Sequence, residues 1–222
     1  MLDLLIQNKD MFLQGTWESL YMTVFSTFFA YLIGLPLGIW VYTSAPGGIA
    51  PAPKTNTVLG WIINIGRSIP FIILMVALIP FTRMVVGKSI GPTAACVSLI
   101  VAAAPFVARL VETSLEELDG GVIEAAKTMG ATNKQIILKV LLPESIPSLV
   151  RGLSISTITL IGYSAMAGAV GGGGLGDIAI RYGYHRYQQG IMVITIILLV
   201  IIVQIIQCLF NFIARKIDKR TI

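Results

Sequence analysis

A run of glycines is the first feature of this sequence that could do chemistry. Gly171, Gly173 and Gly176 have the spacing G-x-G-x-x-G, which lets the backbone approach a pyrophosphate in dinucleotide-binding domains. That site needs a preceding β-strand, whereas these glycines follow a long apolar segment, so we reject a dinucleotide site. The glycines instead predict a flexible break and then a short amphipathic helix. Its apolar face would contain Leu175, Ile178, Ala179 and Tyr182.

Other residue types that serve catalysis are scattered along the chain. His185 has no cysteine or histidine at metal-ligand spacing, and Cys96 and Cys208 fall in separate apolar segments, where they are expected to be buried free thiols. The phosphate-binding pattern G-x-x-x-x-G-K-[ST] does not occur in the sequence. The sequence therefore predicts no catalytic residue, no metal site and no nucleotide bound by this chain, so any ATP-driven step would need a separate subunit.

One apolar segment, residues 149–170, is unusually rich in hydroxyl groups. Such a helix either lines a polar path or packs closely against other helices, because hydroxyl groups gain nothing from lipid. We place a gate at Tyr163, Ser164 and Met166, where flexible Met166 could seal a narrow path; the alternative is that Met166 fills a gap in the core. The hydroxyl-bearing residues are Ser154, Ser156, Thr157, Thr159, Tyr163 and Ser164.

Arg67, Ser68 and Pro70 raise a similar choice in an earlier apolar segment. If a membrane helix begins at Val58, Arg67 is a buried charge that costs at least about 2.5 kcal/mol unless it is paired. If the helix begins near Ile69, Arg67 is an anchor at the membrane interface, which is the interpretation we favour. We assign Ser68 and Pro70 to the translocation path, and Pro70 predicts a kink because it lacks a backbone donor.

Residues 112–147 look like a soluble segment between two membrane spans. Val122, Ala125, Ala126 and Met129 have helical i, i+3, i+4, i+7 spacing, so they form one narrow apolar stripe. Gly130 is suited to end this helix, and Thr132 with Gln135 predicts a capping box that opens a second helix, Asn133 to Leu142, closed by Pro143. The stripe, with Glu124 beside it, predicts a docking surface; the alternative is an ordinary surface hairpin.

Membrane helices are expected to hold these residues in place. Apolar residues make up 55% and charged residues 12% of the chain, and the mean hydropathy is +0.84, values outside the range of soluble domains. We predict one all-α membrane domain, residues 1–222, whose net charge serves anionic lipid and not nucleic acid. Its five expected transmembrane helices are 20–42, 58–81, 90–111, 149–170 and 190–213.

Basic residues set the expected orientation. By the positive-inside rule the side with more lysine and arginine is cytoplasmic, which puts the C-terminus and the docking segment inside and the N-terminus outside. The cytoplasmic set is Lys127, Lys134, Lys139, Arg151, Arg215, Lys216, Lys219 and Arg220.

Several motifs together resemble the permease subunit of the bacterial methionine ABC importer, over nearly the whole chain. They are Glu124-Ala125-Ala126 with Gly130, Arg67 to Leu74, Ala103 to Arg109, Lys139 to Glu144, and Gly162 to Met166 with Gly174 to Gly176. The resemblance implies that residues 112–147 form a coupling loop between spans 3 and 4, in which Val122, Glu124, Ala125, Ala126, Met129 and Gly130 contact the ATPase.

The same resemblance implies the partners of the chain. These are a homodimeric ABC ATPase that binds ATP and Mg, a second copy of the chain, and an extracytoplasmic methionine-binding lipoprotein. The chain itself would be a non-enzymatic permease of the inner membrane without a cofactor. Its substrate would be methionine, with the stereochemical preference open. A permease for another small nutrient, and a passive channel or secondary transporter, are the alternatives.

Overall fold

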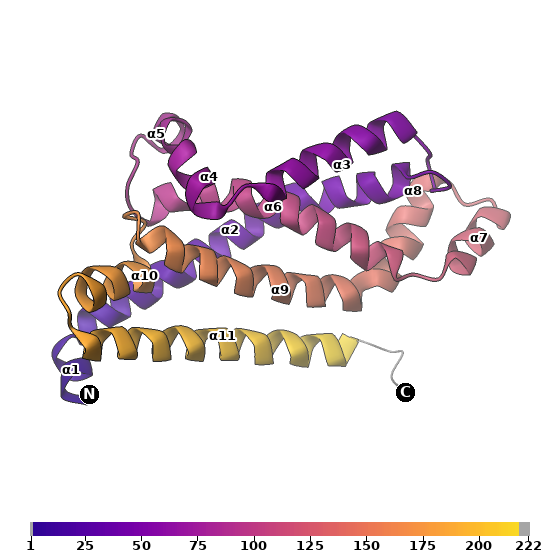
Figure 1. Ribbon diagram of the computed structural model, residues 1–222. Coiled ribbons are helices and arrows are strands. Elements are labelled where there is room, and N and C mark those ends of the chain that lie inside the picture. Colours follow the sequence, from indigo (N-terminus) through magenta and orange to yellow (C-terminus); the bar gives the residue numbers. More distant parts are fainter. Residues whose placement is uncertain (1, 218–222) are drawn as a thin grey trace. The chain divides into compact units, whose positions relative to one another are not determined.

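The computed structural model describes residues 2–217, and every regular element in this range is a helix. Among the described residues, three helices are long and apolar enough to cross a membrane, or four if α3 and α4 are counted as one broken span. The all-α fold with membrane-crossing helices is confirmed, and the count of five transmembrane helices stays a prediction. The elements, of which Figure 1 labels the α-helices, are α1 (Leu2–Gln7), α2 (Lys9–Ser44), α3 (Pro53–Ser68), α4 (Phe71–Ala77), α5 (Ile79–Val86), α6 (Pro92–Glu116), α7 (Gly120–Thr128), α8 (Asn133–Ile136), the π-helix η1 (Ile137–Leu141), α9 (Leu142–Gly168), α10 (Gly174–Ile178), the π-helix η2 (Ala179–Tyr184) and α11 (Gln189–Ile217).

The chain forms two compact units, to both of which the long helices α2, α6, α9 and α11 contribute. The first unit comprises the described chain up to Ala30 together with Ile69–Ala103 and Ser156–Gln207. The second unit comprises Tyr31–Ser68, Ala104–Ile155 and the described chain from Cys208.

The first unit packs α10 and the start of α11 onto the start of α2. Phe12 of α2, Leu175 and Ile178 of α10, and Ile191 and Ile194 of α11 are buried in one apolar cluster. Leu175 and Ile178 of the predicted apolar face are thus buried in the protein, and Tyr182 packs against the same cluster. The short helix predicted after the glycines is present as α10 and continues as η2. Close packing of these side chains fixes α10 against α2 and α11.

The second unit packs the later part of α2 against α3 and α6. Val41, Ile63 and Ala108 form its buried cluster. Gly38 lets α2 and α6 approach closely, since a Cβ at this position would lie only 2.5 Å from the carbonyl oxygen of Ala108. The Asn56 amide donates to the Val41 carbonyl oxygen at 2.7 Å, which holds the start of α3 beside α2.

The range predicted as a single second span, 58–81, contains two breaks. Pro70 has φ −57° and ψ 132°, an extended conformation that ends α3 and begins α4. This break follows from chemistry: proline has no N–H to donate and disfavours helical geometry at the residue before it, here Ile69. A second break lies at Leu78, where Pro80 occupies the first turn of α5.

Pro143 does not close a helix, contrary to the prediction from the sequence. The helix passes from α8 through η1 directly into α9, and Pro143 is the second residue of α9. A π-helix shifts the hydrogen-bond register by one residue, so a proline just after it can be tolerated.

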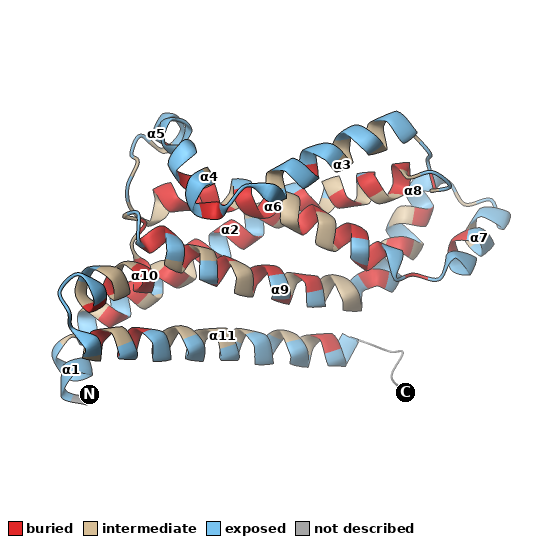
Figure 2. Ribbon diagram, in the orientation of Figure 1, coloured by how far each residue is buried: buried red, intermediate tan, exposed pale blue. Residues whose placement is uncertain are grey.

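Burial differs strongly among the long helices. In the most apolar 18 residues of α6, 61% of the residues are buried, against 11% in α11. Figure 2 shows α11 mostly in the exposed and intermediate colours. An apolar helix with so little cover within its own chain is suited to face lipid or another subunit.

Candidate coupling and translocation site

The segment between α6 and α9 forms a helical hairpin, residues 119–141, which we call the coupling hairpin. Asp119 caps α7 by accepting the Gly121 N–H at 2.9 Å. The predicted end of this helix is confirmed, since Gly130 has a left-handed φ of +78°. The predicted capping box is also confirmed, because Gln135 Oε1 accepts the Thr132 N–H at 2.8 Å while Thr132 Oγ1 accepts the Gln135 N–H.

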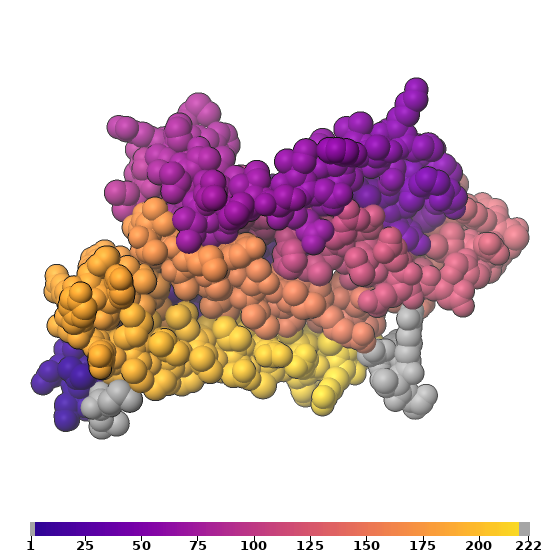
Figure 3. Space-filling model, viewed as in Figure 1, coloured from indigo at the N-terminus to yellow at the C-terminus, as the bar shows by residue number. Residues whose placement is uncertain are grey.

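The apolar stripe of α7 is uncovered in the chain. Met129 is 87% and Val122 41% exposed, while Ala125 and Glu124 are exposed and Ala126 is half-buried. Ile123, on a different side of the helix, is buried within the second unit, to which α7 belongs. The surface of α7 lies open in Figure 3, in pink. A methionine and a valine left exposed beside small alanines favour contact with another protein.

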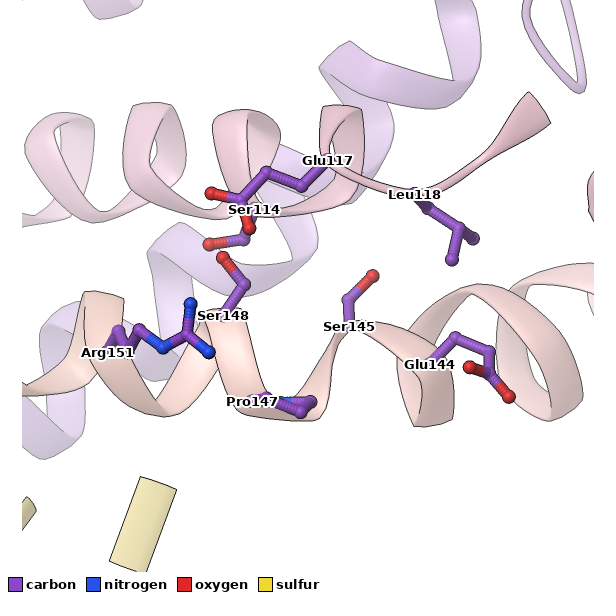
Figure 4. A pocket seen from close by; sticks show the side chains of 8 residues that line it. All are labelled: Ser114, Glu117, Leu118, Glu144, Ser145, Pro147, Ser148 and Arg151. Carbon is purple, nitrogen blue, oxygen red and sulfur yellow. The ribbon is translucent and has the colours of Figure 1, made fainter. Parts of the chain in front are cut away.

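A polar pocket lies at the base of the hairpin, where α6 ends and α9 begins. Figure 4 shows Ser114 and Glu117 on one side and Ser145 and Ser148 on the other, with side chains directed into the space between the two helices. The pocket has a volume of about 170 Å³, enough for several water molecules. The Ser145 hydroxyl is buried and has no hydrogen-bond partner among residues 2–217, so water is suited to fill this pocket.

Charged and polar side chains join α3 to α6 in the second unit. Arg109 forms an ion pair with Glu112, with 2.6 Å between Nη1 and Oε2. Its other terminal nitrogen donates to Asn64 Oδ1 at 2.9 Å. Arg67 is exposed in the last turn of α3, where a basic residue is favourable next to the helix C-terminus, so no buried charge is needed to explain it.

The predicted gate residues on α9 have different environments. The Tyr163 ring stacks on Phe71, with ring centroids 4.7 Å apart. Ser164 is 1% exposed and donates to the Ile161 carbonyl oxygen of its own helix at 2.8 Å, whereas Met166 is 46% exposed. Tyr163 and Met166 therefore have surface available to line a translocation path, whereas the Ser164 hydroxyl is buried within its own chain.

The remaining predicted path residues lie at the break between α3 and α4. Pro70 is exposed and belongs, like Tyr163, to the first unit, where its neighbour Phe71 brings it close to α9. Ser68 belongs to the second unit and donates to the Asn64 carbonyl oxygen of its own helix at 2.7 Å.

Most hydroxyl groups of α9 serve packing within the chain. Ser154, Ser156 and Thr157 are buried, as Ser164 is. Of the two explanations for this polar helix, close packing accounts for these four residues. The exposed residues of α9 are Pro143, Glu144, Ile146, Arg151, Ile155, Gly162 and Met166.

Comparison with known proteins decides what this arrangement is. The family described as binding-protein-dependent transport system inner membrane component matches residues 34–221. The chain belongs to this family. It is thus the membrane component of a transport system and not an enzyme, and the ATPase of such a system is a separate subunit.

Curated relatives match this permease over 71% to 95% of their own length. The probable D-methionine transport system permease protein MetI of Vibrio cholerae is 49% identical over 96% of this chain and 95% of its own. The D-methionine transport system permease protein MetI of Escherichia coli is 55% identical over 70% of this chain and 71% of its own.

Solved structures agree with the sequence comparison. A chain of the inward-facing methionine ABC transporter MetNI, in its CY5 SeMet soak crystal form, is 50% identical and superposes with a TM-score of 0.95 over 96% of this chain and 99% of its own. An amino acid ABC transporter determined with histidines has a TM-score of 0.75 at 21% identity over 96% of both chains, which shows a shared fold.

Sequence reasoning missed three of the contacts that organise this permease. Asp119 before two glycines is a readable capping signal, and Arg109 with Glu112 has the i, i+3 spacing of a helical ion pair. The contacts of Glu18 with Gly174 join positions 156 residues apart, and no local pattern points to them.

Proposed function

We propose that this permease carries methionine across the cytoplasmic membrane as part of an ATP-driven importer. The observation that carries the proposal is the exposed stripe of Val122, Ala125, Ala126 and Met129 on a capped hairpin, in a chain that is about half identical to methionine transport permeases. A passive channel has no use for such a docking hairpin. The fold and the stripe do not select the substrate; its proposed identity rests on the names of the relatives.

The proposed complex contains two copies of this permease, a homodimeric ATPase that holds ATP and Mg, and an extracytoplasmic methionine-binding lipoprotein. We place the N-terminus outside and the C-terminus inside, on the basis of the lysine and arginine distribution. Of that cytoplasmic set, Lys219 and Arg220 lie outside the described residues. This orientation makes the coupling hairpin accessible to a cytoplasmic ATPase.

Coupling follows from the way the chain is connected. The hairpin leads through η1 into α9 without an intervening loop, and α9 carries Tyr163 and Met166. Closure of the ATPase around ATP would displace the hairpin, and α9 would transmit this displacement as one helix. The transporter would thereby switch between inward-open and outward-open states as rigid bodies.

The residue roles follow from the environments described above. Val122, Ala125, Ala126 and Met129 would contact the ATPase, Glu124 would lie at the border of that contact, and Gly130 would set the turn between the two arms of the hairpin. Tyr163 and Met166 would form the gate with the backbone at Pro70. Ser164 would support the gate from within the chain, and Ser68 would mark the end of α3.

Uptake by proteoliposomes tests this function. The permease is reconstituted with its proposed ATPase and binding protein, and uptake of radiolabelled L- and D-methionine is compared with that of alanine and histidine. ATP-dependent, concentrative uptake of methionine alone is the expected result. Uptake of another amino acid would reassign the substrate, and equilibration without ATP would support the channel.

A further inference from the structure

The turn after α9 uses glycine backbone conformations that few other residues adopt. Gly171, Gly173 and Gly174 have φ values of +85°, +81° and +76°. This geometry directs the backbone N–H groups of Gly174 and Leu175, at the start of α10, toward the side chains of α2. Because these two groups begin a helix, they have no partner within α10 itself.

Two adjacent residues of α2 satisfy both groups. Glu18 Oε2 accepts the Gly174 N–H at 2.7 Å, and Ser19 Oγ accepts the Leu175 N–H at 2.9 Å. The other carboxylate oxygen of Glu18 accepts the side-chain amide of Gln14 at 2.9 Å, which orients the carboxylate. Ser19 is 4% exposed, so water cannot easily replace its contact.

The carbonyl side of the turn is fixed as well. The Gly91 N–H, just before α6, donates to the Gly171 carbonyl oxygen at 2.9 Å. All these residues belong to the first unit, so the turn is tied to α2 and to the start of α6 within that unit.

Close packing explains why glycine is needed here. A Cβ at Gly176 would overlap the backbone of Ala165, and a Cβ at Gly168 would overlap that of Asp177. A Cβ at Gly174 would lie 2.6 Å from the Ser19 hydroxyl. The backbones of α9 and α10 therefore touch directly, and the expectation of a flexible break at these glycines is not supported.

We propose that Glu18 and Ser19 are positioning residues for transport, which clamp the glycine turn so that α10 and the neighbouring end of α9 move with α2 as one body. Met166 lies two residues before Gly168, so the clamp fixes the part of α9 that carries the proposed gate. Only the transport measurement rests on the proposed function. The clamp itself is tested by how strongly the backbone amides of the turn are protected from hydrogen exchange.

Hydrogen–deuterium exchange of the complete transporter in nanodiscs tests the clamp directly. Glu18→Ala and Ser19→Ala should each make amides in peptides covering residues 171–178 exchange at least tenfold faster, because their acceptors are removed. Glu18→Gln keeps an acceptor oxygen and should restore most of the protection. Asp10→Ala, which removes an exposed carboxylate from the same helix, is the matched control and should leave these peptides unchanged.

Transport assays distinguish a positioning role of Glu18 from a contribution to stability alone. Glu18→Ala should assemble with the ATPase yet hydrolyse severalfold more ATP per methionine imported, and Glu18→Gln should recover most of the coupling. Unchanged exchange at residues 171–178 in both alanine variants, or equal uncoupling in Asp10→Ala, would overturn the proposal. If the wild type does not import methionine, the exchange result still decides the clamp, and only the proposed substrate fails.

Discussion

The rings of Phe71 and Tyr163 lie nearly parallel, with 4.7 Å between their centroids and 3° between their planes. Phe71 is the first residue of α4 after the break at Pro70, and Tyr163 is in the hydroxyl-rich helix α9. Aromatic stacking of this kind contributes about 0.5–1.5 kcal/mol beyond the area that it buries. It therefore links the proline break to the proposed gate within the first unit.

Replacing Tyr163 tests whether this stack supports the gate. Tyr163→Leu removes the stacking and should lower the melting temperature of the purified permease by a few degrees, at about 2–4 °C per kcal/mol. It should also raise methionine leak through proteoliposomes without ATP. Tyr163→Phe keeps the ring and should behave as the wild type in both measurements. A leak of equal size in both variants would assign the effect to the lost hydroxyl group.

Met166→Ala tests the seal itself. Because Met166 is 46% exposed, we expect only a small change in thermal stability, while efflux from preloaded proteoliposomes or ATP hydrolysis without transport should rise. A large loss of stability with unchanged leak would instead show that Met166 fills a core contact, made by a second subunit in the assembled complex.

Ala126→Trp tests docking of the ATPase. The half-buried Ala126 lies beside exposed Ala125, so an indole here would separate the stripe from a closely fitted partner. Overpacking of this kind costs about 1–3 kcal/mol or more, and we expect loss of ATPase pull-down and of transport with normal membrane insertion. Lys127→Trp puts the same side chain on the opposite face of α7 and should retain binding. Wild-type transport by Ala126→Trp would refute the docking role.

The local signals in this sequence were sufficient for the hairpin but not for the glycine turn. Gly130 and the Thr132–Gln135 capping box depend on neighbours within a few residues, and the structure has both. Pro143 does not end a helix because the π-helix η1 precedes it, and the sequence alone does not reveal this π-helix.

The structure of the glycine turn could not be predicted from local sequence signals. Glycine permits both flexibility and close contact, and the sequence around Gly171–Gly174 does not distinguish them. Only the long-range acceptors Glu18 and Ser19, together with the contact of Gly176 against Ala165, reveal a closely packed turn. Similarly, burial of Ser164 depends on the neighbours of α9, and hydroxyl content alone cannot show which side of the helix they cover.

A double-mutant cycle tests the ion pair between Arg109 and Glu112 within α6. Arg109→Met leaves Glu112, only 9% exposed, without its ion partner and should destabilise the permease clearly in thermal unfolding. Glu112→Gln alone should cost less, and the double variant should recover part of the loss, with a coupling energy of about 0.5–3 kcal/mol. Additive effects of the two substitutions would mean that the pair contributes no mutual stabilisation.

Cross-linking tests whether two copies meet along α9, as the proposed homodimer requires. Met166 lies on the exposed side of this helix, in line with Ile155 and Gly162, whereas Ser164 is 1% exposed inside its own chain. In a background without Cys96 and Cys208, Met166→Cys should therefore form an intersubunit disulfide in native membranes under mild oxidation. Ser164→Cys, two residues away, is the matched control and should remain monomeric on gels. Efficient cross-linking at Ser164 and none at Met166 would mean that the opposite side of α9 faces the partner, and the gate would then have to be sought on that side.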